Sequence, residues 1–333
     1  MIMIKEEPKT NPATFDPLFL VDVKALFLQE KEENLSPYLY STPDPDIEGD
    51  LANGEIHYYK IISENSGYYL YKEEIELMNS AAKQIAAYVP PEASIIEFGP
   101  GTDIAFRNKT LPFLKEVKQL KSYIPIDLCE TYLIQSEEIL SYELPEVLVK
   151  PIKTDFIKNV DLVSNYHLPV VFFKGSTITN LSQDNCLDFL SRIAPTLKHN
   201  GRLIVGVDAN QSESSLRQAY DNDMVAKFIL STLHYINRDL PISGFDPSAF
   251  KYEFNWVAEK HCVAHNVRAT KEQNFILDGT PINIQNGTKF HFFSSYKYPI
   301  DYFQNIALKA GLKSLDYFVH ENQRMVIHVL EAQ

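Results

Sequence analysis

The feature that most constrains the fold is an alternation of short apolar runs with longer helical segments between residues 94 and 209. The apolar runs are SIIEFG (94–99), SYIPIDL (122–128), a strand within 146–156, LPVVFFKGS (168–176) and RLIVGVDA (202–209). Their length and composition are typical of buried strands. The segments 103–119, 129–143 and 183–201 between them have helical patterns. Strands that alternate with helices predict a largely parallel sheet covered on both faces.

Two stretches rich in tyrosine and phenylalanine lie outside this alternation. Five tyrosines fall between residues 58 and 71, and residues 250–277 and 288–298 alternate polar and apolar side chains as antiparallel strands do. A helical pattern at 299–311 and a hairpin pattern at 314–331 then complete the α/β region. Because the chain leaves the α/β region and returns to it, we expect a discontinuous second domain of α+β type.

These patterns set the expected domain limits. We assign 76–211 and 298–333 to a Rossmann-like α/β domain with a C-terminal antiparallel hairpin, and 18–75 and 212–297 to the second domain. Residues 1–17 are polar and hold three prolines, which favours a flexible N-terminus. Ligands of open α/β sheets bind at the carboxyl ends of the strands, so the site is expected at that edge.

Charge and cysteine content exclude several classes of protein. The net charge of −13 disfavours a nucleic-acid or anionic-membrane partner, because phosphate binding depends on clustered Lys and Arg. Cys129, Cys186 and Cys262 are far apart and form no CxxC pair, so no metal site is expected. No apolar run reaches the roughly 18 residues that span a membrane, and the N-terminus lacks a signal-peptide pattern. We expect a cytoplasmic protein and a monomer, with an oligomer left open.

The first strand of the alternation runs into a glycine turn, EFGPGTDI (97–104). Glycines at the carboxyl end of a strand let the backbone approach a ligand where any Cβ would clash. A dinucleotide-binding turn carries a third glycine in the pattern GxGxxG, and Ile104 stands at that position here. The turn alone is therefore weak evidence for a nicotinamide cofactor.

Acidic and aromatic residues end the next two strands. Asp127 closes IPIDL, where a carboxylate can accept hydrogen bonds from both hydroxyls of a ribose. Asp155 and Phe156 close KTDF, where they suit the amino group and the ring of an adenine. Together with the ExGxG turn, these positions favour S-adenosylmethionine over NAD. The simpler alternative is that they are strand-end caps and a plain turn.

Five stretches become distinctive in combination: IIEFGPGT, YIPIDL, FFKGSTITNL, AYDNDMVAKFILSTLHYINRDL and FDPSAFKYEFNW. They resemble, in the same order, the histidine-specific Nα-methyltransferase family of ergothioneine biosynthesis, to which fungal N-methyltransferases of prenylated tryptophan are related. The resemblance runs from about residue 56 to the end, and GSTITN and INRDL are its most specific parts. It implies a Rossmann-like methyltransferase domain, a second domain that binds the amino acid, and S-adenosylmethionine as cofactor.

The resemblance also implies roles for single residues. The family's cofactor residues match Gly99, Gly101, Asp127, Asp155 and Phe156. We also expect the cofactor to contact Glu97, Thr102, Gly175 and Ser176. A lysine that follows the glycine turn in relatives is Ala105 here, which removes one polar contact. Asn180 and Tyr220 match the residues that hold the amino-acid backbone, and they are the implied catalytic residues. Tyr68 and Tyr59 match an aromatic wall of the substrate pocket.

The substrate pocket departs from the family pattern. The histidine enzymes hold the imidazole with a glutamate and a serine two residues apart on a strand, and the alignment puts Phe293 and Ser295 there. His265 stands where those enzymes have methionine. A buried phenyl ring cannot accept the imidazole N–H, and an unpaired buried donor costs about 1–3 kcal/mol. We therefore expect a pocket reshaped for another side chain, aromatic or indolic, and not for histidine.

The sequence favours an S-adenosylmethionine-dependent N-methyltransferase that acts on the α-amine of an amino acid or a derivative and releases S-adenosylhomocysteine. One alternative is an O- or ring-N-methyltransferase of a small aromatic metabolite. Another is a catalytically degenerate binding protein of the same fold, which Ala105 and Phe293 would suit. No general base is assigned, because no histidine lies in triad spacing with an acid and a nucleophile.

Overall fold

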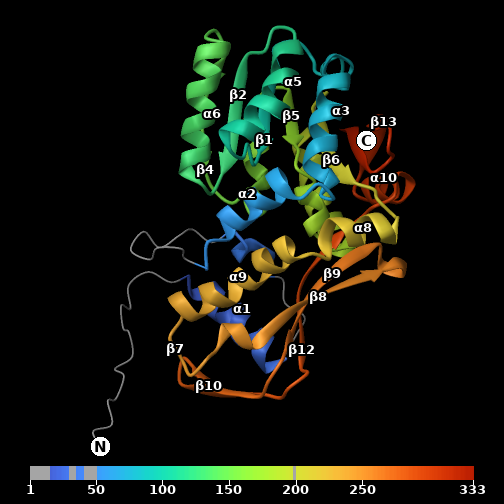
Figure 1. The fold of residues 1–333 in the computed structure, drawn as a ribbon. Coiled ribbons are helices and arrows are strands. Elements are labelled where there is room, and N and C mark those ends of the chain that lie inside the picture. Colours follow the sequence, from blue (N-terminus) through green and yellow to red (C-terminus); the bar gives the residue numbers. More distant parts are fainter. Residues whose placement is uncertain (1–15, 30–34, 41–50, 198–199) are drawn as a thin grey trace, which may run out of the picture. The chain divides into compact units, whose positions relative to one another are not determined.

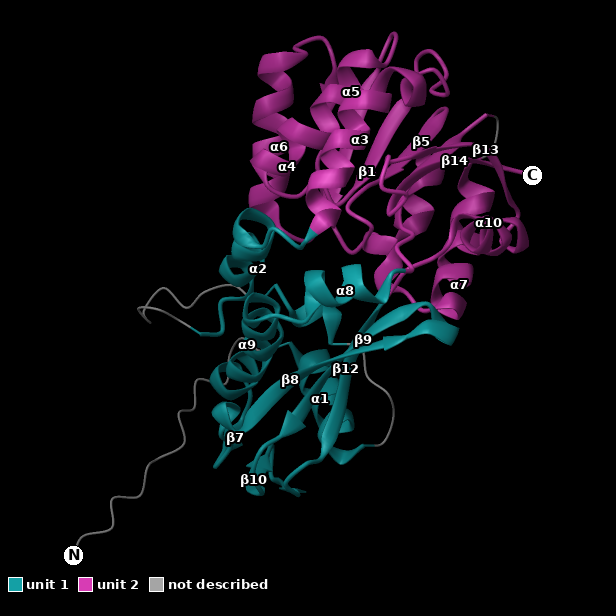
Figure 2. Ribbon diagram, turned by 45° about the vertical axis from the view of Figure 1, so that its right-hand side comes forward, with its two compact units in different colours: residues 1–68, 212–295 teal, residues 69–211, 296–333 magenta. Residues whose placement is uncertain are grey.

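The computed structural model describes residues 16–29, 35–40, 51–197 and 200–333. The chain forms two compact units, each built from two segments (Figure 2). Unit 1 comprises residues 1–68 and 212–295, and unit 2 comprises residues 69–211 and 296–333. The predicted flexible N-terminus (1–17) lies mostly outside the described residues.

Unit 2 contains an eight-stranded sheet that confirms the predicted Rossmann-like architecture (Figure 1). Its strands are β1 (Ser94–Phe98), β2 (Ser122–Asp127), β3 (Leu148–Val149), β4 (Ile152–Lys153), β5 (Pro169–Phe173), β6 (Arg202–Asp208), β13 (Leu312–Val319) and β14 (Met325–Ala332). The order is β13-β14-β6-β5-β1-β2-β3, and β4 also pairs with β2. Strands β1 to β6 pair in parallel, whereas β14 runs antiparallel to both β6 and β13. The expected C-terminal hairpin is therefore present.

Helices cover both faces of this sheet. They are α3 (Tyr69–Ala86), α4 (Asp103–Ala105), α5 (Leu111–Glu116), α6 (Glu130–Glu143), α7 (Gln183–Ile193) and α10 (Ile300–Lys309). Every residue of β1 is buried, and neighbours point to opposite sides: Ile95 joins the cluster under α3, α5 and α6, and Ile96 joins the cluster under α7 and α10. Burial on both faces explains why β1 and β5 are continuous apolar runs.

The helix after the glycine turn is less regular than its pattern predicted. The segment 103–119 forms α4, then five residues of π-helix at Phe106–Thr110 (η2), then α5, which ends at Glu116. The helix predicted at 183–201 likewise ends early, because α7 stops at Ile193 and a 3-10 turn, Ala194–Leu197, with proline at its second position follows. Proline lacks the N–H that continues a helix and clashes with the preceding turn. π-helical turns in other proteins often lie at functional sites.

Unit 1 is of mixed α+β type. Its helices are α1 (Pro17–Leu28), α2 (Gly54–Glu64), α8 (Glu213–Tyr220) and α9 (Asp223–Asp239). Its strands are β7 (Ile242–Ser243), β8 (Phe250–Val257), β9 (Cys262–Ala269), β10 (Gln273–Leu277), β11 (Thr280–Ile284) and β12 (Lys289–Tyr296). They form two three-stranded sheets, β11-β10-β7 and β12-β9-β8. Short 3-10 turns complete the two units at Ser36–Tyr38, Val160–Asn165, Thr177–Asn180, Pro247–Ala249 and Ala258–Lys260.

One aromatic core holds unit 1 together. Phe19 of α1, Phe228 of α9 and Phe292 of β12 belong to a single buried cluster. The side chain of Asn222 accepts hydrogen bonds from the N–H groups of Met224 and Val225 and so caps the start of α9. This cap separates α8 from α9.

A buried histidine in unit 2 makes folding sensitive to acid. His328 on β14 is fully buried beside Phe303, and neither ring nitrogen has a hydrogen-bond partner among the described residues. Burial lowers its pKa from 6.5 to about 3. Between these values the unfolded chain binds the additional proton, so stability falls as the pH falls, by roughly 2 kcal/mol at pH 5.

We therefore expect His328→Leu to raise the melting temperature more at pH 5 than at pH 7. Leucine fills a similar volume and cannot take up a proton in the unfolded chain. Thermal unfolding followed by circular dichroism at both pH values measures the difference. His167→Leu is the control, because His167 is exposed. An equal shift at the two pH values for the His328 variant would contradict the expectation.

Candidate functional site

In unit 2 the chain leaves β1 through a turn that only glycine accommodates easily. Gly99 and Gly101 have φ values of +72° and +70°, in the left-handed region that side chains disfavour. The Gly99 N–H donates to the Ile126 carbonyl at 2.9 Å and ties the turn to the end of β2. Thr102 Oγ1 accepts a hydrogen bond from the Ala105 N–H at 3.3 Å and starts α4. At Gly99 and Gly101 the turn therefore presents backbone without a Cβ at the carboxyl edge of the sheet.

Asp127 lies at the same edge, one strand away. It ends β2, which pairs in parallel with β1, and its half-buried carboxylate accepts from the Cys129 N–H at 2.8 Å. Burial raises the pKa of this carboxyl, while the Cys129 N–H and the Lys174 ammonium act in the opposite direction. The strand register therefore brings a carboxylate to the edge where the glycine turn lies.

Asp155 and Phe156 follow β4, which pairs with the end of β2 at Asp127 and Lys153. The Phe156 ring stacks on Phe98 with centroids 5.0 Å apart and planes at 6°. A Cβ on Gly99 would lie 3.9 Å from the Phe156 ring, so the ring lies beside the turn. Asp155 Oδ1 accepts from the N–H groups of residues 157 and 158, at 2.9 and 3.3 Å. Asp155 therefore caps its own turn, in agreement with the simpler alternative, while Phe156 provides an aromatic surface.

Glu97, one of the predicted cofactor residues, is fully buried below the turn. Its Oε1 accepts from Thr110 Oγ1 at 2.8 Å and lies 3.0 Å from the Lys174 ammonium. Its other oxygen accepts from the Tyr123 hydroxyl. Glu97 therefore connects β1 to Thr110, Tyr123 and Lys174. A direct contact of Glu97 with a cofactor stays a prediction.

The loop after β5 carries the motif GSTITN. The Gly175 N–H donates to Glu74 Oε1 at 2.6 Å, and Ser176 is buried with a φ of +52°. A non-glycine residue in this region is strained, and such strain is frequent at functional sites. Asn180 ends the 3-10 turn Thr177–Asn180 and is half-buried. Within the described part of the chain nothing hydrogen-bonds its amide group, so the amide can serve a ligand.

In unit 1 four of the predicted substrate residues form one aromatic array. Tyr68 meets Tyr220 edge to face with centroids 5.7 Å apart, and Tyr220 meets His265 at 5.6 Å. His265 in turn stacks on Phe293, with centroids 4.4 Å apart and planes at 17°. His265 and Phe293 come from the strands β9 and β12, which lie next to each other in the sheet. The array therefore joins residues from four separate segments.

A close approach of two backbones brings Tyr68 to Tyr220. The Asn65 amide donates to the Ala219 carbonyl at 3.1 Å, and Asn65 Oδ1 accepts from the Gly67 N–H at 3.0 Å. A Cβ on Gly67 would lie only 2.6 Å from the carbonyl oxygen of Gln218. Only glycine allows this contact, which pins the segment before Tyr68 against the end of α8.

The array gains a member that the sequence had not indicated. Tyr252 on β8 and His265 on β9 share a hydrogen bond of 2.9 Å between the hydroxyl and Nδ1, and their rings stack with centroids 5.9 Å apart. The antiparallel register sets His265 opposite Phe254, so Tyr252 is its diagonal neighbour. The alternation in KYEFNW (251–256) could have indicated that Tyr252 lies on a strand, although it could not identify the strand beside it. Lys174 was also missed; a lysine directly after the apolar run VVFF was its signal.

Two predicted substrate residues lie outside the ring contacts of the array. Tyr59 on α2 is 52% exposed, and its neighbour Tyr58 packs against Tyr40 and Phe228 instead. Ser295, near the end of β12, is buried and two residues beyond Phe293. Roles for both residues in substrate binding stay predictions.

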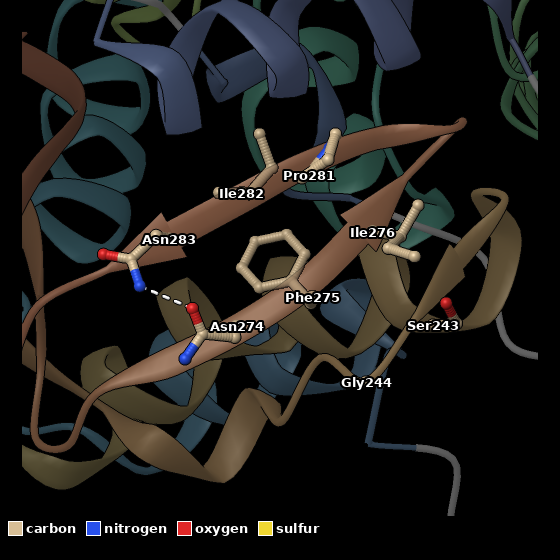
Figure 3. Close-up of a pocket in the computed structure, with 8 residues that line it drawn as sticks. All are labelled: Ser243, Gly244, Asn274, Phe275, Ile276, Pro281, Ile282 and Asn283. Atoms are coloured by element: carbon tan, nitrogen blue, oxygen red, sulfur yellow. Dashed lines mark hydrogen bonds between the residues drawn. The ribbon is translucent and has the colours of Figure 1, made fainter.

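A surface pocket of about 410 Å³ lies on the sheet β11-β10-β7 of unit 1 (Figure 3). It is lined by Ser243, Gly244, Asn274, Phe275, Ile276, Pro281, Ile282 and Asn283. The Asn283 side chain donates to that of Asn274 across the two strands. This lining has no titratable side chain and none of the predicted site residues, so the pocket offers no acid, base or charged ligand group.

The described residues lack two features that would point to other functions. No group of three or more His, Cys, Asp or Glu side chains could hold a metal ion. In the same residues, no helix has both the length and the apolar character to cross a bilayer. The expected absence of a metal cofactor stays a prediction.

Known proteins resemble this chain along most of its length. A histidine N-α-methyltransferase of Mycolicibacterium smegmatis is 26% identical over 209 residues, which cover 62% of this chain and 64% of the relative. An N-methyltransferase of Aspergillus flavus is 26% identical and covers 78% and 76%. A 4-dimethylallyltryptophan N-methyltransferase of Aspergillus fumigatus is 24% identical and covers 78% and 80%. The chain thus spans just under two thirds of the mycobacterial relative.

A match to a whole family agrees with these relatives and with the resemblance seen in the sequence. Residues 21–332 match the family described as histidine-specific methyltransferase, SAM-dependent. The match covers both segments of unit 2 and nearly all described residues of unit 1. The chain therefore belongs to the SAM-dependent, histidine-specific methyltransferase family.

Proposed function

We propose that this protein is an S-adenosylmethionine-dependent N-methyltransferase that acts on the α-amine of an amino acid or of an amino-acid derivative. The observation that carries the proposal is the meeting of the glycine turn, the Asp127 carboxylate and the Phe156 ring at one edge of the sheet. These groups fit an adenosyl group, because a carboxylate accepts from ribose hydroxyls and a phenyl ring packs against a base. We further propose that the enzyme is cytoplasmic and monomeric and that its substrate is a small molecule.

We assign the cofactor to unit 2 and the side chain of the amino acid to unit 1. The domain limit is set at residues 68 and 69 instead of 75 and 76, because α3 begins at Tyr69 and belongs wholly to unit 2. The other limits then fall at 211 and 295, against the expected 211 and 297. Asp127, Phe156 and the backbone of the turn would hold the adenosyl group.

The chain's own groups would bring the amine to reaction. S-adenosylmethionine, when bound, supplies a methyl group already activated by a sulfonium. A free α-amine has a pKa near 8 and is mostly protonated at pH 7. Burial disfavours the charged amine, so a dry site would lower its pKa. Asn180 offers an acceptor and a donor that can hold the neutral amine in a fixed direction, and Tyr220 offers a hydroxyl.

The aromatic array supports a substrate other than histidine. Phe293, which stands where the histidine enzymes have a glutamate, is 6% exposed and stacks on His265. This position therefore holds an apolar ring and no hydrogen-bond acceptor. An imidazole N–H aimed at it would stay unpaired. The relatives' names include both histidine and 4-dimethylallyltryptophan as substrates. We propose an amino acid with an aromatic side chain, which would pack on this array.

Mass spectrometry of a substrate screen tests the proposal. The full chain is incubated with S-adenosylmethionine and each of the twenty amino acids, aromatic biogenic amines and prenylated tryptophan. We expect a mass gain of one or more methyl groups on the α-nitrogen of an aromatic amino acid. Methylation on oxygen or on a ring nitrogen would support the small-metabolite alternative. Binding of S-adenosylhomocysteine without turnover would support the degenerate binding protein, and no binding would refute the cofactor.

Phe293→Glu is expected to raise turnover of histidine at least tenfold over the unchanged protein. The new carboxylate would supply the acceptor that the imidazole N–H lacks, and a charged hydrogen bond contributes about 1.5–3 kcal/mol. Steady-state kinetics with histidine measure the change. Phe293→Leu is the control, because it frees space without an acceptor. Equal rates for the two variants would show that residue 293 does not face the substrate.

A further inference from the structure

We propose that Lys174 is a positioning residue that holds the glycine turn in the shape that binds the adenosyl group. This inference rests on the proposed function and deepens it. Lys174 directly follows β5, which lies beside β1 in the sheet. Its side chain is 5% exposed, so its ammonium must find its partners inside the protein.

The ammonium of Lys174 has three partners, and two are carbonyls of the turn. It donates to the Pro100 carbonyl at 2.7 Å and to the Gly99 carbonyl at 3.1 Å. Its third partner is Glu97 Oε1, at 3.0 Å. Two of its three N–H donors are thus hydrogen-bonded to carbonyls of the turn, and the ion pair with Glu97 compensates the buried charge. The two carbonyls belong to consecutive residues, so these bonds fix the directions of both peptide groups between Gly99 and Gly101.

The groups on either side of the Lys174 ammonium, Glu97 and the backbone after Lys174, are themselves held by other contacts. Glu97 is fixed by the hydroxyls of Thr110 and Tyr123 in addition to Lys174. The residue after Lys174 is fixed through its N–H, which donates to Glu74, and Glu74 is ion-paired with the buried Lys109. The backbone next to Lys174 is therefore held in place. The ammonium of Lys174 in turn holds the backbone of the glycine turn by direct hydrogen bonds.

Lys174 also acts on the neighbouring carboxylate of the site. Its charge favours the ionised form of Asp127, against the effect of burial. The ionised form is the one that accepts two hydrogen bonds from a ribose. Loss of Lys174 would thus disturb two groups of the adenosyl site at once, without a direct contact between Lys174 and the cofactor.

The test compares two buried lysines of unit 2. Lys174→Met removes the cation at the turn, and Lys297→Met removes a fully buried cation that pairs with Asp208 at 3.0 Å, outside the predicted cofactor residues. Each leaves one buried carboxylate without its ammonium, so both are expected to lower the melting temperature. Only Lys174→Met is expected to raise the dissociation constant for S-adenosylhomocysteine, at least tenfold by titration calorimetry, and the KM for S-adenosylmethionine with it.

A double variant separates positioning from folding. Glu97→Gln with Lys174→Met leaves no unpaired buried charge, so stability should recover, yet the turn carbonyls still lack their donor and binding should stay weak. Should Lys174→Met fail to fold, this variant carries the test. Normal binding by either folded variant, or an equal loss in Lys297→Met, would overturn the role of Lys174. Absence of binding in the unchanged protein would instead overturn the proposed function and this inference with it.

Discussion

Asp127→Ala is expected to raise the dissociation constant for S-adenosylhomocysteine by roughly 10- to 150-fold. The carboxylate ends β2 beside the glycine turn and would accept hydrogen bonds from the ribose. Loss of a charged hydrogen bond costs about 1.5–3 kcal/mol, and each 1.4 kcal/mol is a factor of ten in affinity. Titration calorimetry on the purified protein measures the change.

Acid should act in the same direction as the substitution. Burial raises the pKa of Asp127, so its carboxyl takes up a proton at a higher pH than an exposed aspartate. The protonated form is a poorer acceptor for the ribose, and affinity should fall as the pH drops through this pKa. Asp188→Ala is the matched control, because Asp188 on α7 is exposed and pairs only with Arg192 in the described structure. An unchanged dissociation constant for Asp127→Ala would refute the ribose assignment.

Asn180→Ala is expected to lower kcat/KM for the amino acid about 100-fold while the affinity for S-adenosylhomocysteine changes less than threefold. The amide has no partner within the described residues, so its removal should leave the fold intact. Without Asn180 the amine would no longer be aimed at the methyl group, and misplacing a reactant by about 1 Å can lower the rate about 100-fold. Steady-state kinetics and calorimetry on the same preparation separate the two effects.

The exposed Asn185 on α7 offers a matched control for this prediction. Asn185→Ala makes the same chemical change five residues away and should leave both quantities unaltered. If Asn180→Ala weakened cofactor and amine binding equally, Asn180 would belong to the adenosyl site. If it changed neither, Asn180 would cap its turn and no more.

Much of unit 2 could be predicted because its signals are local. Apolar runs that alternate with helices predicted the parallel sheet, and acids at strand ends predicted the edge at which they gather, since parallel strands all end on one side. The strand register then sets Asp127 and Phe156 beside the glycine turn, as expected. The π-helical break at Phe106–Thr110 was missed, because its residues have an ordinary helical pattern.

Unit 1 was harder to predict because its geometry depends on which strands pair. The alternating patterns of residues 250–277 and 288–298 indicated strands but not which strand lies beside which. The structure sets β9 between β12 and β8, and this order makes His265 the neighbour of both Phe293 and Tyr252. The sequence pointed to Tyr68 more firmly than to Tyr59, but only the structure shows the close contact at Gly67 that brings Tyr68 to Tyr220.

The sequence by itself determined the α/β class, the two glycines of the turn and the acids at the strand ends, because periodicity and backbone freedom are properties of neighbouring residues. Only the tertiary structure decided that Lys174, which is 75 positions from Gly99, holds that turn, and that Phe293 stacks on His265. Such contacts form when distant segments are packed together and their polar groups must find partners away from water, and no local pattern records which partner each one finds.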